Sequence, residues 1–501
     1  MRRHPHLLEI SAWPWLERLS REARHLVTLA NVPAAHWDRL AMDGFDVLFL
    51  MGVWRRSAIG RDIARTHPGM IAEYDRALPG WTLEDVPGSP YCIQAYEPDS
   101  RMGGWQGLDT ARSELKARGI ALVLDFVPNH TGFDHPWIQE HPGRYVLGTE
   151  ADHRNAPADF RAIDISGVTF HVACGRDPYF APWTDVAQLN YFNPDTRAAM
   201  RTTLEDIAAH CDGVRCDMAM LVLNDVFEHT WRRLLRDEWP PLTTEFWPDI
   251  TGSIPQLLYL AEVYWGLEGR MLEQGFTFAY DKRLFDSLHA PDRAARTRGL
   301  LAAANPDPNR LSRFIENHDE ARSAATLADI LPGAASLLAT SAGMRFFFEG
   351  QLDGRRVKVP VQMGRWPPEP ADASVRALYE RLLAFAGRPV LHDGTPQILS
   401  VSAAGDGSFA DIVAYRWRSD RALALVVVNL GASRSQAYVA VAPDLPPGAA
   451  FDFEDCLTDV RYHRKRESLL DQGLFVRLEA GAAHLFSVSP ASDLDSSGLP
   501  I

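Results

Sequence analysis

The chain has 501 residues, of which 46% are hydrophobic and 23% are charged, a balance typical of globular proteins and not of disordered or fibrous ones. Its 51 basic and 65 acidic side chains give a net charge of -14. This charge argues against nucleic acid and anionic membranes as partners, because both attract positive surface. No stretch approaches 18 apolar residues, so we expect no membrane-spanning segment.

The cysteines and the N-terminus favour a cytoplasmic protein. There are five cysteines, scattered and without a CxxC pair, so neither a disulfide framework nor a thiolate zinc site is indicated. Reduced thiols are typical of the cytoplasm. The N-terminal stretch lacks the apolar core of a signal peptide, because Glu9 and Glu17 interrupt it.

Eight short apolar runs have the composition of strands that are buried on both faces. In chain order they are 7–13, 46–52, 120–127, 213–218, 257–264, 276–280, 313–317 and 344–350. Helical patterns lie between them, and this alternation predicts an α/β fold built on a (β/α)₈ TIM barrel. A doubly wound sheet would also alternate. However, the GxGxxG fingerprint of its dinucleotide-binding members is absent after the first strand.

Two segments outside the strands suggest further structure. The connection 128–195 is too long for an ordinary βα loop, and it predicts a small subdomain inserted after the third strand, at about 131–195. From about residue 391 the runs become β-branched or alternating, which predicts a C-terminal antiparallel β-sandwich over 391–490. Residues 1–390 would then form the barrel domain, and 491–501 a disordered tail.

Polar residues end four of the predicted strands, at the rim where (β/α)₈ barrels carry their active sites. These residues are Asp125, Asn129 and His130 on the third strand, Arg215 and Asp217 on the fourth, Glu262 on the fifth, and Asn317, His318 and Asp319 on the seventh. Each group alone has a structural alternative: a buried ion pair for Arg215 and Asp217, or a helix N-cap for Asn317. Together they bring three carboxylates and an arginine to one rim.

Three carboxylates at one rim suit the cleavage of glycosidic bonds. A retaining glycosidase places a carboxylate nucleophile about 5–5.5 Å from a carboxylic acid. Neighbouring strands lie about 4.8 Å apart, so Asp217 and Glu262 could meet this requirement. Arg215 shares a strand face with Asp217 and would keep it ionised. Asp319 would stabilise an oxocarbenium-like transition state, and His130 and His318 would donate hydrogen bonds to sugar hydroxyls.

The segments DFVPNH (125–130), GVRCDMAM (213–220), AEVYW (261–265) and ENHDE (316–320) resemble, in order and spacing, the four ordered regions of the α-amylase family of retaining glycoside hydrolases. The resemblance implies Asp217 as the nucleophile, Glu262 as the general acid/base and Asp319 as the transition-state stabiliser. It also implies a set of residues around the sugar in the cleaved position: Tyr91, Asp125, His130, Arg215 and His318.

The resemblance leaves several functions open. An α-glucan or maltooligosaccharide hydrolase is the main expectation. The alternatives are an α-glucan transglycosylase, a disaccharide-acting enzyme of the sucrose or trehalose type and, less favoured, a non-catalytic glucan-binding protein. No cofactor is required, although Asn129 corresponds to a calcium ligand of many relatives. A metal-dependent barrel enzyme is disfavoured because Arg215 would repel a cation.

Aromatic residues near the predicted strand ends suggest a surface that stacks on sugar rings. Trp54, Trp183, Tyr264 and Trp265 are candidates for stacking on a sugar ring, with ordinary packing as the alternative. The sequence does not indicate the oligomeric state.

Overall fold

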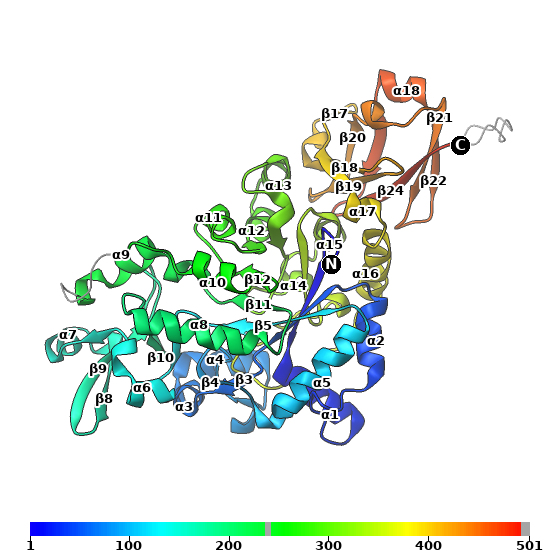
Figure 1. The fold of residues 1–501 in the computed structure, drawn as a ribbon. Coiled ribbons are helices and arrows are strands. Elements are labelled where there is room, and N and C mark those ends of the chain that lie inside the picture. The colour runs from blue at the N-terminus through cyan, green and yellow to red at the C-terminus, as the bar shows by residue number, and fades with distance from the viewer. Residues whose placement is uncertain (236–241, 492–501) are drawn as a thin grey trace.

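The computed structural model describes residues 1–235 and 242–491, and within them eight parallel strands close into a barrel (Figure 1). The order around the barrel is β1-β15-β14-β13-β12-β11-β5-β2. The strands are β1 His6–Ser11, β2 Val47–Met51, β5 Ala121–Phe126, β11 Gly213–Cys216, β12 Leu258–Ala261, β13 Phe278–Asp281, β14 Leu311–Arg313 and β15 Met344–Phe348. This arrangement confirms the predicted (β/α)₈ barrel.

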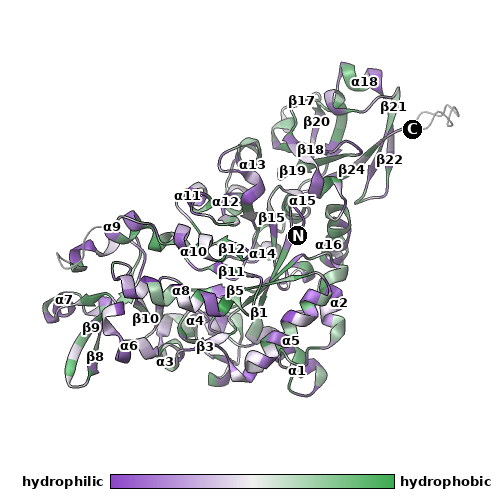
Figure 2. Ribbon diagram, in the orientation of Figure 1, coloured by the Kyte–Doolittle hydropathy of each residue, from purple (hydrophilic) through white to green (hydrophobic). Residues whose placement is uncertain are grey.

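Helices connect the strands and cover the outside of the barrel. They include α1 Ala12–Ala23, α2 Ala34–Met42, α5 Gly104–Ala117, α8 Pro194–Ala208, α9 Asn224–Leu235, α10 Trp247–Ser253, α11 Glu268–Glu273, α12 Arg283–His289, α13 Arg293–Ala302, α15 Leu331–Thr340 and α16 Ala373–Ala386. Figure 2 shows hydrophilic and hydrophobic residues mixed along helices such as α2 and α5, whereas β1 and β5 are mostly hydrophobic. Helices such as α2 and α5 therefore bury one face and leave the other to solvent, whereas α15 is buried along almost its whole length.

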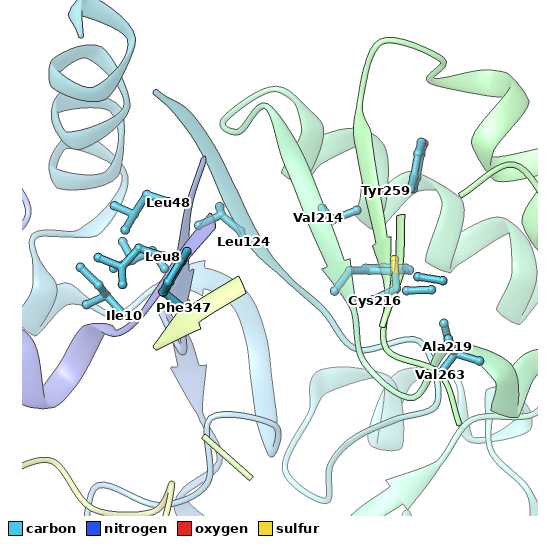
Figure 3. Packing of buried hydrophobic residues seen from close by; sticks show 14 of the residues in the cluster. Leu8, Ile10, Leu48, Leu124, Val214, Cys216, Ala219, Tyr259, Val263 and Phe347 are labelled. Atoms are coloured by element: carbon cyan, nitrogen blue, oxygen red, sulfur yellow. The ribbon is translucent and has the colours of Figure 1, made fainter. Parts of the chain in front are cut away.

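Side chains alternate across each barrel strand, and this alternation determines which residues reach the barrel interior. The cluster between strands and helices contains Leu8, Leu48, Leu124, Val214 and Tyr259 (Figure 3). A separate cluster of interior residues contains Leu7, Val47, Val123, Leu260 and Phe346. Glu9 and Asp125 lie two residues beyond Leu7 and Val123, so both carboxylates point into the barrel. Arg215 does the same on β11, two residues after Gly213.

A small sheet is inserted after the third barrel strand, as expected, and lies at the opposite end of the molecule from the C-terminal strands (Figure 1). Its order is β6-β10-β9-β7, with β8 paired to β9. The strands are β6 His130–Gly132, β7 Leu147–Gly148, β8 Phe160–Ile165, β9 Val168–Gly175 and β10 Trp183–Gln188. The earlier connection carries α3 Ala58–Thr66, α4 Pro68–Ala77 and the paired strands β3 Trp54–Arg56 and β4 Ile93–Pro98.

Two antiparallel sheets follow the barrel and fit the predicted C-terminal sandwich. One has the order β16-β18-β19-β24-β21-β22 and the other β17-β20-β23. The strands are β16 Thr395–Ile398, β17 Val401–Ala403, β18 Ile412–Arg418, β19 Leu423–Asn429, β20 Ser435–Val439, β21 Ala450–Asp455, β22 Arg461–Lys465, β23 Leu474–Leu478 and β24 Ala483–Pro490. The domain boundary near residue 390 stays a prediction. The expected tail, 491–501, lies outside the described residues apart from Ala491.

The predicted seventh strand, 313–317, is misplaced, because β14 ends at Arg313. A turn follows the predicted range. The Asn317 Oδ1 accepts from the backbone N–H groups of Asp319 and Glu320, both at 2.9 Å. The Asn317 side chain thus stabilises this turn.

The helices of the described ranges are all too short or too polar to cross a membrane. The five cysteines are free: Cys92, Cys174, Cys211 and Cys216 are buried, and Cys456 is partly exposed.

Gly213 allows the close approach of β11 to its neighbours, and this contact can be tested. A Cβ at this position would lie 2.8 Å from both the Cβ and the carbonyl oxygen of Leu258 on β12. We expect Gly213→Ala to lower the free energy of unfolding by about 1–3 kcal/mol, measured by urea denaturation, because the barrel wall is overpacked. Gly252→Ala in α10 is the control, since nothing lies within 4 Å of its added Cβ. Equal effects of the two variants would contradict this account.

Candidate active site

One buried guanidinium joins carboxylates from three neighbouring barrel strands. The Arg215 Nη1 donates to Oδ1 of Asp217 at 2.7 Å, and Nη2 lies 2.8 Å from Oε2 of Glu262. Oδ1 of Asp125 lies 3.8 Å from the same Nη1. The parallel register pairs Arg215 with Asp125 on β5 and with Leu260 on β12. The sequence-predicted residues of the third, fourth and fifth strands therefore meet at one cation.

Asp217 and Glu262 differ in how firmly they hold a proton. Their side chains are only 8% and 4% exposed. Burial raises the pKa of Asp217, and the ion pair with Arg215 opposes this rise. Burial raises the pKa of Glu262 to about 7, helped by the charges of Asp217 and Asp319 and opposed by Arg215. Glu262 is therefore partly protonated near neutral pH.

Two neutral donors fix the orientation of the Glu262 carboxyl group. The Met218 backbone N–H donates to Oε2 at 2.7 Å, and the Tyr264 hydroxyl donates to Oε1 at 2.8 Å. Met218 has a φ of 42°, which is uncommon for a residue other than glycine. This left-handed turn directs its N–H at Glu262. Both carboxyl oxygens are thus held in place relative to Asp217.

His318 links Asp319 to a glutamate buried on β1. Its Nε2 lies 3.0 Å from Oδ2 of Asp319, and its Nδ1 lies 2.5 Å from Oε1 of Glu9. Burial would lower the pKa of His318, but the two carboxylates raise it well above the usual value. Burial would raise the pKa of Asp319, but His318 lowers it to about 2. Since the Asp319 side chain is 48% exposed, water screens part of this pairing.

Tyr91 and His130 lie beside this cluster. The Tyr91 hydroxyl is 2.7 Å from Nε2 of His318, and its ring centroid is 5.1 Å from Cζ of Arg215. The His130 ring lies against the Tyr91 backbone and 5.4 Å from the Trp183 ring. Burial lowers the pKa of His130 to about 3, so its imidazole is neutral near pH 7. All eight site residues predicted from the sequence thus lie in or next to one cluster.

Glu9 was missed as a site residue by the sequence analysis, although the signal was present. It is fully buried, and the carboxylate interrupts the apolar strand 7–13 two residues after the interior Leu7. A buried carboxylate requires a charged or hydrogen-bonding partner. Lys358 was also missed: its Nζ donates to the backbone oxygen of Asp319. Trp54 packs internally and does not line a cleft, because it is buried and donates Nε1–H to the backbone oxygen of Asp125 at 2.8 Å.

The surroundings of Asn129 do not fit a calcium ion. The Gln188 Nε2 donates to Oδ1 of Asn129 at 2.9 Å, and the Asn129 Nδ2 donates to Oε1 of Gln188 at 3.2 Å. The two amide oxygens that could ligate the ion therefore face amide donors. In residues 1–235 and 242–491, no group of three or more His, Cys, Asp or Glu side chains is arranged to hold a metal.

The link between Glu9 and His318 can be tested without any substrate. Glu9→Gln keeps the shape of the side chain and removes its charge, so the imidazolium loses one of its two counter-ions. We expect the pKa of His318 to fall by about one unit or more, measured by NMR titration of protein with labelled histidine. Glu22→Gln on the surface of α1 is the control, with a 54% exposed side chain. An unchanged His318 pKa in Glu9→Gln would show that the pairing is unimportant.

No family model matches the chain. It is 24% identical to the α-amylase MalA of Haloarcula japonica over 370 residues, which are 72% of this chain and 49% of the relative. It is 26% identical to maltase A2 of Drosophila melanogaster over 238 residues, which are 44% of this chain and 39% of the relative. These two matches thus span about half or less of the relative's length.

The fold has a close counterpart among solved structures. The noncanonic maltogenic α-amylase AmyB of Thermotoga neapolitana superposes with a TM-score of 0.68 at 16% identity, covering 97% of this chain and 98% of that one. The sequence relatives, the barrel and the four segments at its rim together support the resemblance of this chain to the α-amylase family of glycoside hydrolases.

Proposed function

We propose that this protein is a retaining glycosidase that acts on α-glucosidic bonds of α-glucans or maltooligosaccharides. The observation that carries the proposal is the pairing of Asp217 and Glu262 on the two terminal nitrogens of Arg215. This arrangement brings the two carboxyl groups to one guanidinium, one on each of its terminal nitrogens. A carboxylate and a carboxylic acid held close together suit direct attack by the carboxylate. The named relatives include an α-amylase and a maltase, which supports the substrate class.

In the first step Asp217 attacks the anomeric carbon while Glu262 protonates the leaving oxygen. The ion pair with Arg215 favours the ionised form of Asp217. Glu262 can donate a proton because its pKa lies near 7. The bond from the anomeric carbon to the leaving oxygen breaks, and an ester to Asp217 forms. In the second step Glu262 takes a proton from the incoming hydroxyl group, which displaces Asp217.

The remaining residues stabilise the charge that develops on the sugar. Asp319 is ionised beside the pair and would favour the positively charged transition state. His318 and Glu9 hold Asp319 in place. Tyr91 would pack against the sugar ring, and His130 would contact the sugar beside it. Asp125 accepts a hydrogen bond from the Gly52 N–H at 2.8 Å and would brace Arg215.

The acid role of Glu262 can be tested with leaving groups of different basicity. Glu262→Gln cannot donate a proton, so we expect kcat/KM on maltotriose to fall by about 10²–10⁴. The loss on 2,4-dinitrophenyl α-glucoside should be much smaller, because this leaving group departs without protonation. Glu320→Gln, at the same rim and paired with Lys282 at 3.3 Å, is the control. Equal losses on both substrates would refute the acid role.

The pH profile gives an independent check. Only protonated Glu262 can start the reaction, and burial raises its pKa to about 7. We therefore expect kcat/KM on maltotriose to fall with a basic limb near pH 7 rather than near pH 4–5, the usual range of a glutamate. This limb should be absent from the residual activity of Glu262→Gln. A basic limb near pH 5 in the parent protein would count against the assignment.

We also propose a cytoplasmic location. The five free cysteines, four of them buried, suit a reducing compartment. Fractionation of the producing cell would check this, with recovery outside the cytoplasm as the contrary result.

A further inference from the structure

A cavity of about 370 Å³ lies between α1 and the segment 350–371, which follows β15. Its lining includes three arginines, Arg18 and Arg21 of α1 and Arg355 of the later segment, together with Trp366. Small-molecule sites typically have volumes of about 300–1,000 Å³. The described residues that line the cavity include none of the eight candidate site residues, so it is separate from the proposed catalytic site.

Arg355 carries a positive charge without a partner. Its Nη1 is buried and makes no hydrogen bond, and no carboxylate in residues 1–235 and 242–491 forms an ion pair with it. The side chain lies directly against Gly350, because a Cβ on this glycine would overlap Cδ of Arg355. Gly350 also has a φ of 85°, which favours glycine. A buried charge held in this way is costly unless an anion compensates for it.

Two further guanidinium groups lie near Arg355. Nη2 of Arg18 is 3.3 Å from Oε1 of Glu349, and Nη1 of Arg322 donates to the Glu349 backbone oxygen at 2.9 Å. Arg322 forms its ion pair with Glu316, at 2.8 Å. Burial lowers the pKa of Arg355, Arg18 and Arg322 lower it further, and Glu349 opposes them. The nearby carboxylates therefore do not fully compensate for the charge of Arg355.

Three acidic residues also line the cavity, but each already has a partner. The partners are the Arg18 guanidinium for Glu22 at 3.1 Å, the Arg376 guanidinium for Asp353 at 3.3 Å, and the backbone N–H groups of Arg356 and Val357 for Glu369 at 2.6 and 3.4 Å. These carboxylates are therefore engaged elsewhere, and the charge of Arg355 is left for a ligand.

Trp366 adds a neutral donor to the cavity. It is 4% exposed, and its Nε1–H has no hydrogen-bond partner. Its ring centroid lies 5.6 Å from Cζ of Arg355, and Nε of Arg18 is likewise without a partner. Three lining residues thus offer unused N–H groups. A phosphate group presents three strongly accepting oxygens, whereas a carboxylate presents two, and the planar fork of arginine suits phosphate.

We propose that this cavity binds a phosphate group, either as inorganic phosphate or as part of a sugar phosphate. Arg355 would be the main ligand, with Arg18 and Trp366 as further donors. The inference goes beyond the proposed function and does not depend on it, because the cavity contains no catalytic residue.

Isothermal titration calorimetry tests the proposal with inorganic phosphate and with glucose 6-phosphate, both at the same ionic strength set with sodium chloride. We expect Arg355→Gln to weaken binding by about tenfold or more, since it removes a charge-assisted hydrogen bond. Arg154→Gln is the matched control, because the Arg154 side chain is 66% exposed and pairs with Glu150 in the inserted subdomain. It should bind both ligands as the parent protein does.

The two ligands distinguish the two sources of phosphate. Affinity for inorganic phosphate that equals or exceeds that for glucose 6-phosphate identifies the free ion, and tighter binding of glucose 6-phosphate identifies a sugar phosphate. Either result supports the site if Arg355→Gln weakens binding. Absence of binding to the parent protein, or equal affinity in the parent and Arg355→Gln, would overturn it. Glucose 6-phosphate bound at the catalytic site alone would give this second result.

Thermal unfolding separates a binding role of Arg355 from a structural one. Without phosphate, Arg355→Gln should keep or raise the midpoint temperature, because it removes an uncompensated charge. Added phosphate should raise the midpoint of the parent protein but not that of the variant. A lower midpoint together with an unchanged response to phosphate would show a structural role and overturn the proposal.

Arg355→Lys resolves the case in which Arg355→Gln both unfolds more easily and loses its response. Lysine keeps the charge, so phosphate binding at least about threefold tighter than in Arg355→Gln supports the proposal, and equal binding by the two variants overturns it.

Discussion

The whole site depends on one buried cation. Arg215 is fully inaccessible to solvent, and its charge is compatible with the barrel interior only because Asp217, Glu262 and Asp125 surround it. Removing one partner of a buried ion pair typically costs about 3–5 kcal/mol, since the remaining charge stays buried. The same contacts set the chemistry. The cation favours the ionised form of Asp217. Burial and the charges of Asp217 and Asp319 raise the pKa of Glu262 to about 7. The packing of strands β5, β11 and β12 and the protonation states of the site therefore have a common origin.

A second series of charged residues begins on the other side of the barrel. Glu9 on β1 holds His318, and His318 holds Asp319 at the exposed edge of the cluster. Tyr91 contacts both His318 and Arg215, so the two groups of charged residues meet around the expected position of the sugar. Outside them, the Tyr264 hydroxyl donates to Glu262. In the proposed reaction these charged residues carry out bond cleavage.

Strand pattern was enough to predict the barrel and the inserted subdomain, because buried parallel strands are continuous apolar runs. Strand ends pointed to seven of the eight candidate residues that cluster at the rim, whereas Tyr91 was implied only by the resemblance. Three features lay beyond this reasoning. The Glu9–His318 contact joins residues 309 positions apart, and no local pattern indicates such a pairing. The end of β14 at Arg313 falls inside a buried apolar run that continues through Phe314 and Ile315, so the hydrophobic pattern could not locate it. Met218 and Trp265 adopt left-handed backbone conformations that their residue types disfavour, so backbone propensity would have predicted the wrong conformation at both positions.

The central claim is that Asp217 forms the covalent bond to the sugar while Glu262 acts as the general acid and then the general base. The most direct measurement is to trap the intermediate with 5-fluoro-α-glucosyl fluoride, whose ring fluorine slows the second step more than the first. Proteolysis and mass spectrometry then locate the label. The account predicts a single fluoroglucosyl group on the peptide that carries Asp217, with fragmentation placing it on that carboxylate. A label on Glu262 or Asp319, or inactivation without any covalent label, would contradict the account.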